Sequence, residues 1–338
     1  MGARGHAIRT AVNRVTAIYC TDERFRRDGA FPSAAAGLGK AGARGAGLDI
    51  RAILMGLAFA LMWSSAFTSA RMIVMDAPPL LALTLRFVIS GLIGVGLALA
   101  LGQSWRLTPA QWRATLVFGI CQNALYLGLN FVAMQRIEAG LAAIIASSLP
   151  LLVAAAGWAL LGDRLRPLAV AGLVAGFAGV LLIMGARLAG GIDVLGVGLA
   201  VLGAVALTVA TLMLRGASSG GNVMMIVGLQ MLVGAAALAL PALALEVPQV
   251  NWTWRLFWAF AYTTLVPGLA ATWVWFKLVQ RIGAVKGAAF HFLNPFFGVA
   301  IAAVLLGERV GVLDLVGVAI IMAGILAVQL ARGAPSAR

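Results

Sequence analysis

Hydrophobic residues fill long, nearly uninterrupted runs from Ile53 onward, and polar residues gather in the short segments between those runs. Each run is about twenty residues long, which lets an α-helix cross a hydrocarbon core of about 30 Å. Turn-forming Pro, Gly and Asp residues separate the runs. The pattern predicts an all-α integral membrane protein with ten transmembrane helices, at 53–70, 80–101, 113–134, 139–162, 168–187, 194–214, 223–245, 256–279, 284–306 and 313–331.

The basic residues between these helices predict how the chain is oriented. Basic residues in short loops favour the cytoplasmic side of a membrane. With the N-terminus inside, ten basic residues beyond the N-terminal tail fall on the inner side and five on the outer side. We therefore expect both termini to be cytoplasmic. The inner set is Arg106, Arg113, Arg164, Arg166, Arg215, Lys277, Arg281, Lys286, Arg332 and Arg338, and the outer set is Arg71, Arg136, Arg187, Arg255 and Arg309.

Composition supports the membrane class and excludes others. Of 338 residues, 62% are hydrophobic and 11% are charged, whereas a soluble domain has about a quarter of its residues charged. The net charge of +14 is not gathered on one soluble module, so we expect no nucleic-acid partner. The two cysteines, Cys20 and Cys121, form neither a disulfide framework nor a metal site. We expect no metal, no cofactor and no enzymatic activity, since familiar catalytic motifs are absent.

The N-terminal segment 1–51 differs from the rest of the chain. It is basic, rich in Gly and Ala, and has no apolar run long enough to span a membrane. Apolar residues at helical spacing between Ile8 and Tyr19 also allow a short helix at the membrane surface. We expect a disordered cytoplasmic tail.

The chain repeats itself after 145 residues. Pro150 precedes Leu-Gly-Asp-Arg at 161–164, and Pro295 precedes Leu-Gly-Glu-Arg at 306–309, with 12 residues from proline to glycine in both cases. Gln-Arg-Ile recurs at 135–137 and 280–282, and Gly172 and Gly179 match Gly317 and Gly324. Each repeat holds five helices, at 52–188 and 192–332. Because five is odd, the second repeat must enter the membrane from the opposite side, and inverted repeats of this kind favour transport by alternating access.

These motifs resemble the drug/metabolite transporter superfamily, specifically the EamA family with two repeats of five helices. The resemblance rests on Trp63-Ser64-Ser65 in the first helix and on the two proline helices that end in Leu-Leu-Gly-Asp-Arg and Leu-Leu-Gly-Glu-Arg, each followed by a Gly-rich helix. It implies a carrier of amino acids, other metabolites or drug-like cations. Bacterial exporters of aromatic amino acids of the YddG type are the nearest functional analogy.

Polar residues inside the apolar runs are candidates for substrate binding, because such groups are costly in lipid and usually face the bundle interior. Aromatic, amide and hydroxyl groups together suit a substrate with an apolar body and a polar head. Two other roles would also account for these residues. Trp and Tyr are enriched at membrane interfaces, and Ser and Asn form hydrogen bonds between helices. The candidates are Trp63, Ser64, Asn123, Tyr126, Asn130, Ser147, Ser148, Tyr262, Trp273, Trp275, His291 and Asn294.

Four further residues are candidates for a gate or hinge. Pro150, Pro267 and Pro295 interrupt the hydrogen-bond ladder of three predicted helices. Arg86 lies about six residues inside the second predicted helix, where it either attracts anions, closes an outer gate or extends toward the surface, and Asp76 is the first partner to test. His291 is the one histidine in the apolar runs, so any proton coupling would use it, and neutral packing is an equal alternative.

The sequence therefore predicts a gradient-driven exporter of small metabolites in a bacterial inner membrane, with amino acids, including aromatic ones, as substrates. A carrier of nucleotide-sugar or sugar-phosphate substrates is the main alternative, although it would need several cavity-facing cations. An exporter of drug-like cations is another, and a membrane enzyme or scaffold ranks last. The expected partners of the protein are the lipid bilayer and a small-molecule substrate, and the sequence leaves the oligomeric state open.

Overall fold

The computed structural model describes residues 49–214 and 221–333. The predicted tail lies almost wholly outside them. The described residues contain ten helical spans, each long and apolar enough to cross a membrane. This confirms the prediction of ten helices, with ends shifted by a few residues. The helices are α3 (Ile50–Val74), α4 (Pro79–Ala100), α5 (Pro109–Phe118), α6 (Gly128–Ala133), α7 (Ala139–Ser147), α8 (Leu149–Leu161), α9 (Pro167–Ala189), α10 (Val194–Met213), α11 (Val223–Leu245), α12 (Trp254–Leu265), α13 (Ala271–Ile282), α14 (Ala284–Ala289), α15 (Asn294–Leu306) and α16 (Val312–Gly333).

Four of the ten spans are built from more than one helical segment. The third consists of α5, the π-helical segment η2 (Gly119–Leu127) and α6, and the eighth consists of α12, the π-helical segment η3 (Val266–Ala270) and α13. The fourth breaks at Ser148 between α7 and α8, and the ninth passes from α14 through a 3-10 turn, η4 (Phe290–Leu293), into α15. Such irregular backbone at membrane depth is tolerated where it is buried in protein or lines a cavity.

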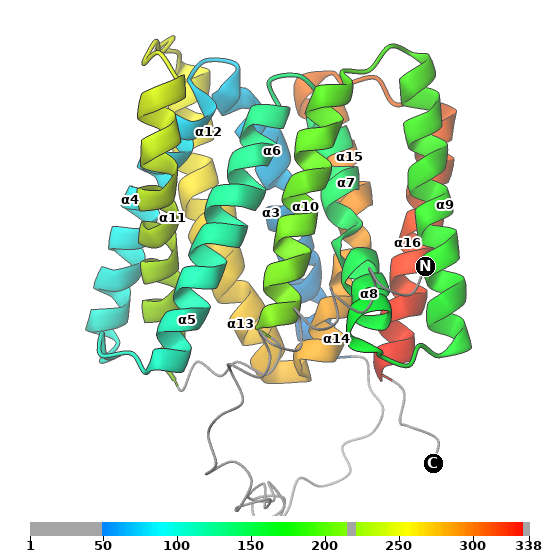
Figure 1. Ribbon diagram of the computed structural model, residues 1–338, viewed down its shortest axis with the longest axis horizontal. Helices are drawn as coiled ribbons and strands as arrows, with labels where there is room; N and C mark the ends of the chain where they lie inside the picture. The colour runs from blue at the N-terminus through cyan, green and yellow to red at the C-terminus, as the bar shows by residue number, and fades with distance from the viewer. Residues whose placement is uncertain (1–48, 215–220, 334–338) are drawn as a thin grey trace, which may run out of the picture. The chain divides into compact units, whose positions relative to one another are not determined.

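Successive spans run in opposite directions (Figure 1). We call the end where α3 begins the lower end and the end where it finishes the upper end. The first span of the second repeat, α10, begins at the upper end, and α16 finishes at the lower end. The two groups of five spans thus have opposite orientations.

The helix pair α9–α16 shows this inverted relation at the level of single residues. A Cβ built on Gly172 would lie 2.7 Å from the carbonyl oxygen of Gly324, and one on Gly179 would lie 2.9 Å from that of Gly317. Gly172 is the repeat equivalent of Gly317, and Gly179 that of Gly324. Each repeat therefore offers the same two glycines, and they meet in crossed, antiparallel order. Small residues of this kind let helix backbones approach closely in a membrane.

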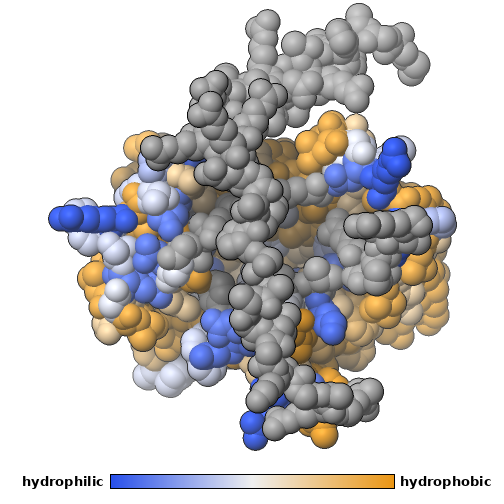
Figure 2. All heavy atoms as spheres, turned by 90° about the horizontal axis from the view of Figure 1, so that it is seen from below, coloured by the Kyte–Doolittle hydropathy of each residue, from blue (hydrophilic) through white to orange (hydrophobic). Residues whose placement is uncertain are grey.

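Polar and aromatic side chains mark the two ends of the bundle. Seen from below, hydrophilic residues gather over the lower end while apolar residues dominate its margin (Figure 2). Arg106, Arg113 and Lys277 are exposed there. Trp105 at the lower end is 65% exposed and Trp254 at the upper end 77%. Exposed tryptophans at both ends are typical of the two interfaces of a bilayer.

Candidate functional site

A cavity of about 520 Å³ lies between the two repeats. Its wall comes from α3, α4, the third span and α8 in the first repeat and from α10, α11, the eighth span and η4 in the second. Both π-helical segments contribute to this wall. A volume in this range is typical of small-molecule sites.

Four rings form an aromatic cluster on one side of the cavity. Phe59 of α3 lies at its centre, with its ring centroid 4.8 Å from that of Trp275, 5.2 Å from that of His291 and 5.7 Å from that of Trp63. The rings of Trp275 and His291 meet edge to face at 5.2 Å. The cluster joins α3 of the first repeat to α13 and η4 of the second. Its flat faces suit an apolar or aromatic group.

Amide side chains line another part of the wall. Asn123 of η2 donates a hydrogen bond from Nδ2 to the carbonyl oxygen of Gln230, at 2.9 Å, and so joins the two repeats. Asn130 of α6 donates from Nδ2 to the carbonyl oxygen of Tyr126, at 2.8 Å, while its own Oδ1 is buried with no hydrogen-bond partner in the described structure. Tyr126 also lines the cavity. These groups offer hydrogen bonds without adding charge.

Arg86 of α4 reaches the cavity from the first repeat. It is 6% exposed, and its Nε is buried with no hydrogen-bond partner among residues 49–214 and 221–333. Its guanidinium carbon lies 5.3 Å from the centroid of the Phe87 ring. Asp76 is not its partner, because that carboxylate binds Arg255, 179 residues further along the chain.

The structure thus brings together eight of the predicted site and hinge residues, and it places the others outside the cavity wall. The lining residues are Trp63, Asn123, Tyr126, Asn130, Trp275, His291, Arg86 and Pro267. Ser64, Ser147, Ser148 and Asn294 are buried between helices, and the three serine hydroxyls donate to backbone carbonyl oxygens. Tyr262 is 40% exposed and hydrogen-bonds Ser65 at 2.8 Å. Trp273 is 56% exposed, with Lys277 over its ring.

The three candidate hinge prolines lie where helices change geometry. Pro150 is in the first turn of α8, directly after the break at Ser148, and Pro295 is in the first turn of α15, directly after η4. Pro267 lies within η3 and has no N–H to donate to the carbonyl group of Thr263 four residues earlier. Whether any of them bends during function stays a prediction.

Several lining residues were not singled out in the sequence. Phe59, Phe67 and Phe118 look like ordinary membrane-facing side chains in an apolar run. Gln230 stands alone in its run, whereas Gln122 directly precedes the candidate Asn123. Phe59 precedes Trp63 by one helical turn, so the helical period was the signal that linked it to the site. The π-helical form of η2, which contains no proline, left no comparable signal.

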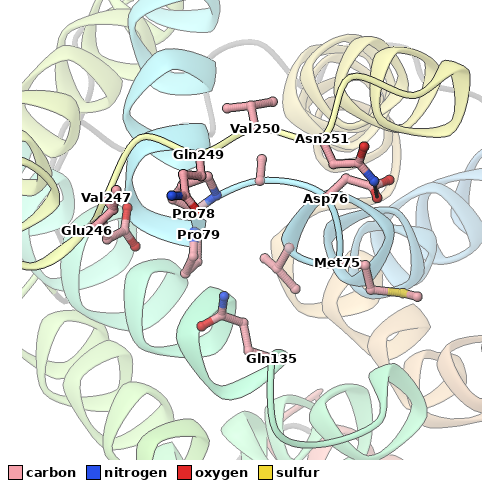
Figure 3. A pocket seen from close by; sticks show the side chains of 12 residues that line it. Met75, Asp76, Pro78, Pro79, Gln135, Glu246, Val247, Gln249, Val250 and Asn251 are labelled. Carbon is pink, nitrogen blue, oxygen red and sulfur yellow. Dashed lines mark hydrogen bonds between the residues drawn. The ribbon is translucent and has the colours of Figure 1, made fainter.

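Asp76 anchors the contacts between the repeats at the upper end. It is 5% exposed and accepts hydrogen bonds from the Arg255 guanidinium at 2.8 and 2.9 Å and from Thr253 at 2.8 Å. The hydrogen bond from Arg255 is the main reason that the pKa of Asp76 lies below its ordinary value of 3.8. Asp76 also borders an open pocket of about 620 Å³, where its side chain lies beside Asn251 while Gln135 lies across the opening (Figure 3).

Two glutamates of the second repeat cap helices of the first at the same end. Glu246 accepts from the backbone N–H groups of Leu80 and Leu81 at 2.8 Å. Glu308 accepts from Ala139 and Gly140 at 2.7 and 2.8 Å. Carboxylates at helix N-termini satisfy free N–H groups and interact favourably with the helix dipole. Burial is the main reason that the pKa of Glu308 is raised. The upper end is thus held by several charge-assisted contacts between the repeats.

Comparison with known proteins places this architecture in a family. The model of the EamA-like transporter family matches twice, at residues 50–185 and 194–330. The chain is 28% identical over 271 residues to an uncharacterized transporter, YvbV, of Bacillus subtilis, covering 80% of this chain and 88% of that protein. It is 33% identical over 139 residues to the aromatic amino acid exporter YddG of Ancylobacter novellus, covering 41% of this chain and 48% of that protein. A crystal structure matches with a TM-score of 0.61 and 26% identity, over 84% of this chain and 98% of that one.

Proposed function

The chain belongs to the EamA-like transporter family and is a multi-pass membrane protein, and we propose that it exports small metabolites, with amino acids, including aromatic ones, as its substrates. The observation that carries this proposal is the cavity between the repeats, which combines an aromatic cluster with amide groups and one cation. Such a wall favours a substrate with an aromatic or apolar body and a small polar head. The partial match to an aromatic amino acid exporter points to the same class.

The composition of the wall argues against the main alternatives. A sugar phosphate or nucleotide sugar carries two or more negative charges and would need several cations around it. Among the described residues that line the cavity, Arg86 alone carries a full positive charge. A drug-like cation would favour a carboxylate, and no Asp or Glu is among the described lining residues.

The mechanism that fits this arrangement is alternating access. Two repeats of similar fold and opposite orientation can rock about a central site, so that the site opens to either side in turn. In this proposal the upper end, held by Asp76, Glu246 and Glu308, faces outward, and both chain ends lie in the cytoplasm of a bacterial cell. The preponderance of basic residues in lower-end loops supports that orientation. An ion or substrate gradient drives transport.

Transport by the purified protein tests the proposal. The full chain is reconstituted in liposomes, and uptake of labelled L-phenylalanine is measured in competition with amino acids, sugars, phosphorylated metabolites and quaternary ammonium compounds, with and without a pH gradient. We expect aromatic and large apolar amino acids to compete best. Competition by phosphorylated compounds or cations alone would overturn the proposal.

A further inference from the structure

We propose that Arg86 binds the carboxylate of the substrate, so that this transporter selects molecules that join an aromatic or apolar body to a single anionic group. This inference rests on the proposed function and goes further, because it assigns the charged end of the substrate to one residue. It concerns recognition by charge, whereas the aromatic cluster concerns recognition by shape and stacking.

The first argument is that Arg86 has no counter-ion among residues 49–214 and 221–333. A guanidinium is ionised at any pH at which a cell lives and can donate five hydrogen bonds. Yet Nε of Arg86 has no partner within the described structure, and the contact found for the group is with the face of the Phe87 ring. A buried charge inside a membrane protein is expensive unless it is paired. An arginine left in this state beside a cavity is poised for an anion that arrives from outside the protein.

The second argument is that a polar group with no partner lies close to Arg86. Gly268 of η3 packs closely here, since a Cβ built on it would lie 3.2 Å from the carbonyl oxygen of Thr263, 3.4 Å from Nη2 of Arg86 and 3.7 Å from Oγ of Ser90. Nη2 and Oγ are therefore both close to the same point. The hydroxyl of Ser90 is itself buried with no hydrogen-bond partner in the described part of the chain. Arg86 and Gly268 both line the cavity. A buried cation at the cavity wall, with an unused hydroxyl behind it, suits a carboxylate.

The third argument concerns the other end of the substrate. Arg86 is seven residues after the first residue of α4, so it lies about 10 Å below the upper end of that helix. Phe59, at the centre of the aromatic cluster, is nine residues after the first residue of α3 and lies about 14 Å above the lower end. The cation and the aromatic cluster are therefore at different depths of one cavity. Such a separation favours an elongated molecule with a ring at one end and a carboxylate at the other.

The same wall treats an ammonium group differently. Since no carboxylate is among the described lining residues, a substrate ammonium would meet only neutral oxygen atoms and ring faces. The carboxylate should therefore contribute more to binding than the amino group. This distinguishes the proposal from general recognition of zwitterions.

A series of three ligands tests the assignment: L-phenylalanine, L-phenylalaninamide, which lacks the carboxylate, and 3-phenylpropionate, which lacks the amino group. Their affinities for the full chain in lipid nanodiscs are measured by calorimetry. For the unchanged protein we expect both carboxylates to bind about tenfold or more tightly than the amide, the range for a hydrogen bond to a charged group. The preference should disappear in Arg86→Gln and persist in part in Arg86→Lys. Arg106→Gln removes an exposed arginine outside the cavity and should keep the full preference.

The outcomes separate this inference from the proposed function. An unchanged carboxylate preference in Arg86→Gln, or no preference in the unchanged protein, would overturn the assignment of Arg86 even if amino acids are transported. A preference for 3-phenylpropionate that depends on Arg86, without transport of any amino acid, would support the assignment and refute amino-acid export. We expect Arg86→Gln without ligand to melt no lower than the unchanged protein, since it removes a buried charge that no described acidic residue pairs with. If that variant fails to fold, Arg86→Lys and the ligand series on the unchanged protein decide.

Discussion

The contact between α9 and α16 gives a sharp prediction about what holds the two repeats together. Replacing Gly324 by alanine would place a Cβ 2.6 Å from the carbonyl oxygen of Gly172 and 2.7 Å from the Cα of Gly176. These are backbone atoms, so they cannot move aside as the end of a flexible side chain would. The two helices would have to separate. Overpacking of this kind lowers stability by about 1 to 3 kcal/mol. Alanine usually stabilises a helix by up to about 1 kcal/mol over glycine, and this gain offsets part of the loss.

Gly185 supplies the matched control in α9. A Cβ built on it meets no heavy atom within 4 Å. Gly185→Ala should therefore be neutral or stabilising, by up to about 1 kcal/mol. The assay is thermal unfolding of both purified variants in the same detergent, followed by tryptophan fluorescence and by the fraction that stays monodisperse. If Gly324→Ala melted at or above the temperature of Gly185→Ala, the close approach of these two helices would be refuted.

Three further predictions concern the site and the upper end. Asp76→Asn should lower the stability of the protein by about 1 to 3 kcal/mol at neutral pH, because it weakens a buried charge-assisted contact. Since Arg255 lowers the pKa of Asp76, this contribution is complete above pH 3.8 and is lost as the pH falls through the lowered pKa. The melting curves of the two proteins should therefore converge in acid. In the liposome uptake assay, Trp275→Ala should raise the half-saturation concentration for aromatic substrates several-fold to about tenfold, because ring contacts are lost. Trp273→Ala removes an exposed ring of the same helix and should leave that concentration unchanged. His291→Gln should change the pH profile of transport if a proton is carried through this residue, and a superimposable profile would reject that role.

Much of the fold follows from the sequence because its signals are local or periodic. Ten apolar runs, separated by turn residues, predict ten spans without any knowledge of which helices touch. The 145-residue repeat adds the inverted relation, because five spans per repeat force it. The crossed meeting of Gly172 with Gly324 and of Gly179 with Gly317 is the structural form of the repeat that the sequence displays.

The candidate site was predicted less completely, because burial inside an apolar run does not tell which side of a helix a residue occupies. Trp273 and Trp275 illustrate this. They are two positions apart, which turns the helix by about 200°, so both cannot face one cavity. Trp275 lines the cavity and Trp273 is exposed.

Long-range pairing was the other feature that local reasoning could not reach. Asp76 is ten residues from Arg86 in the sequence, and this proximity suggested a pair. The structure joins Asp76 to Arg255 and leaves Arg86 beside the cavity. The partner of a buried charge depends on which helices pack together, and nothing in the neighbouring sequence specifies that choice.

Counterflow tests the central claim most directly. Liposomes that contain the full chain are loaded with unlabelled L-phenylalanine and diluted into a trace of the labelled compound. We predict a transient accumulation of label that is absent from empty liposomes, that Trp275→Ala reduces and that Trp273→Ala leaves intact. No accumulation for any aromatic amino acid, or equal accumulation in the two variants, would contradict transport through the cavity between the repeats.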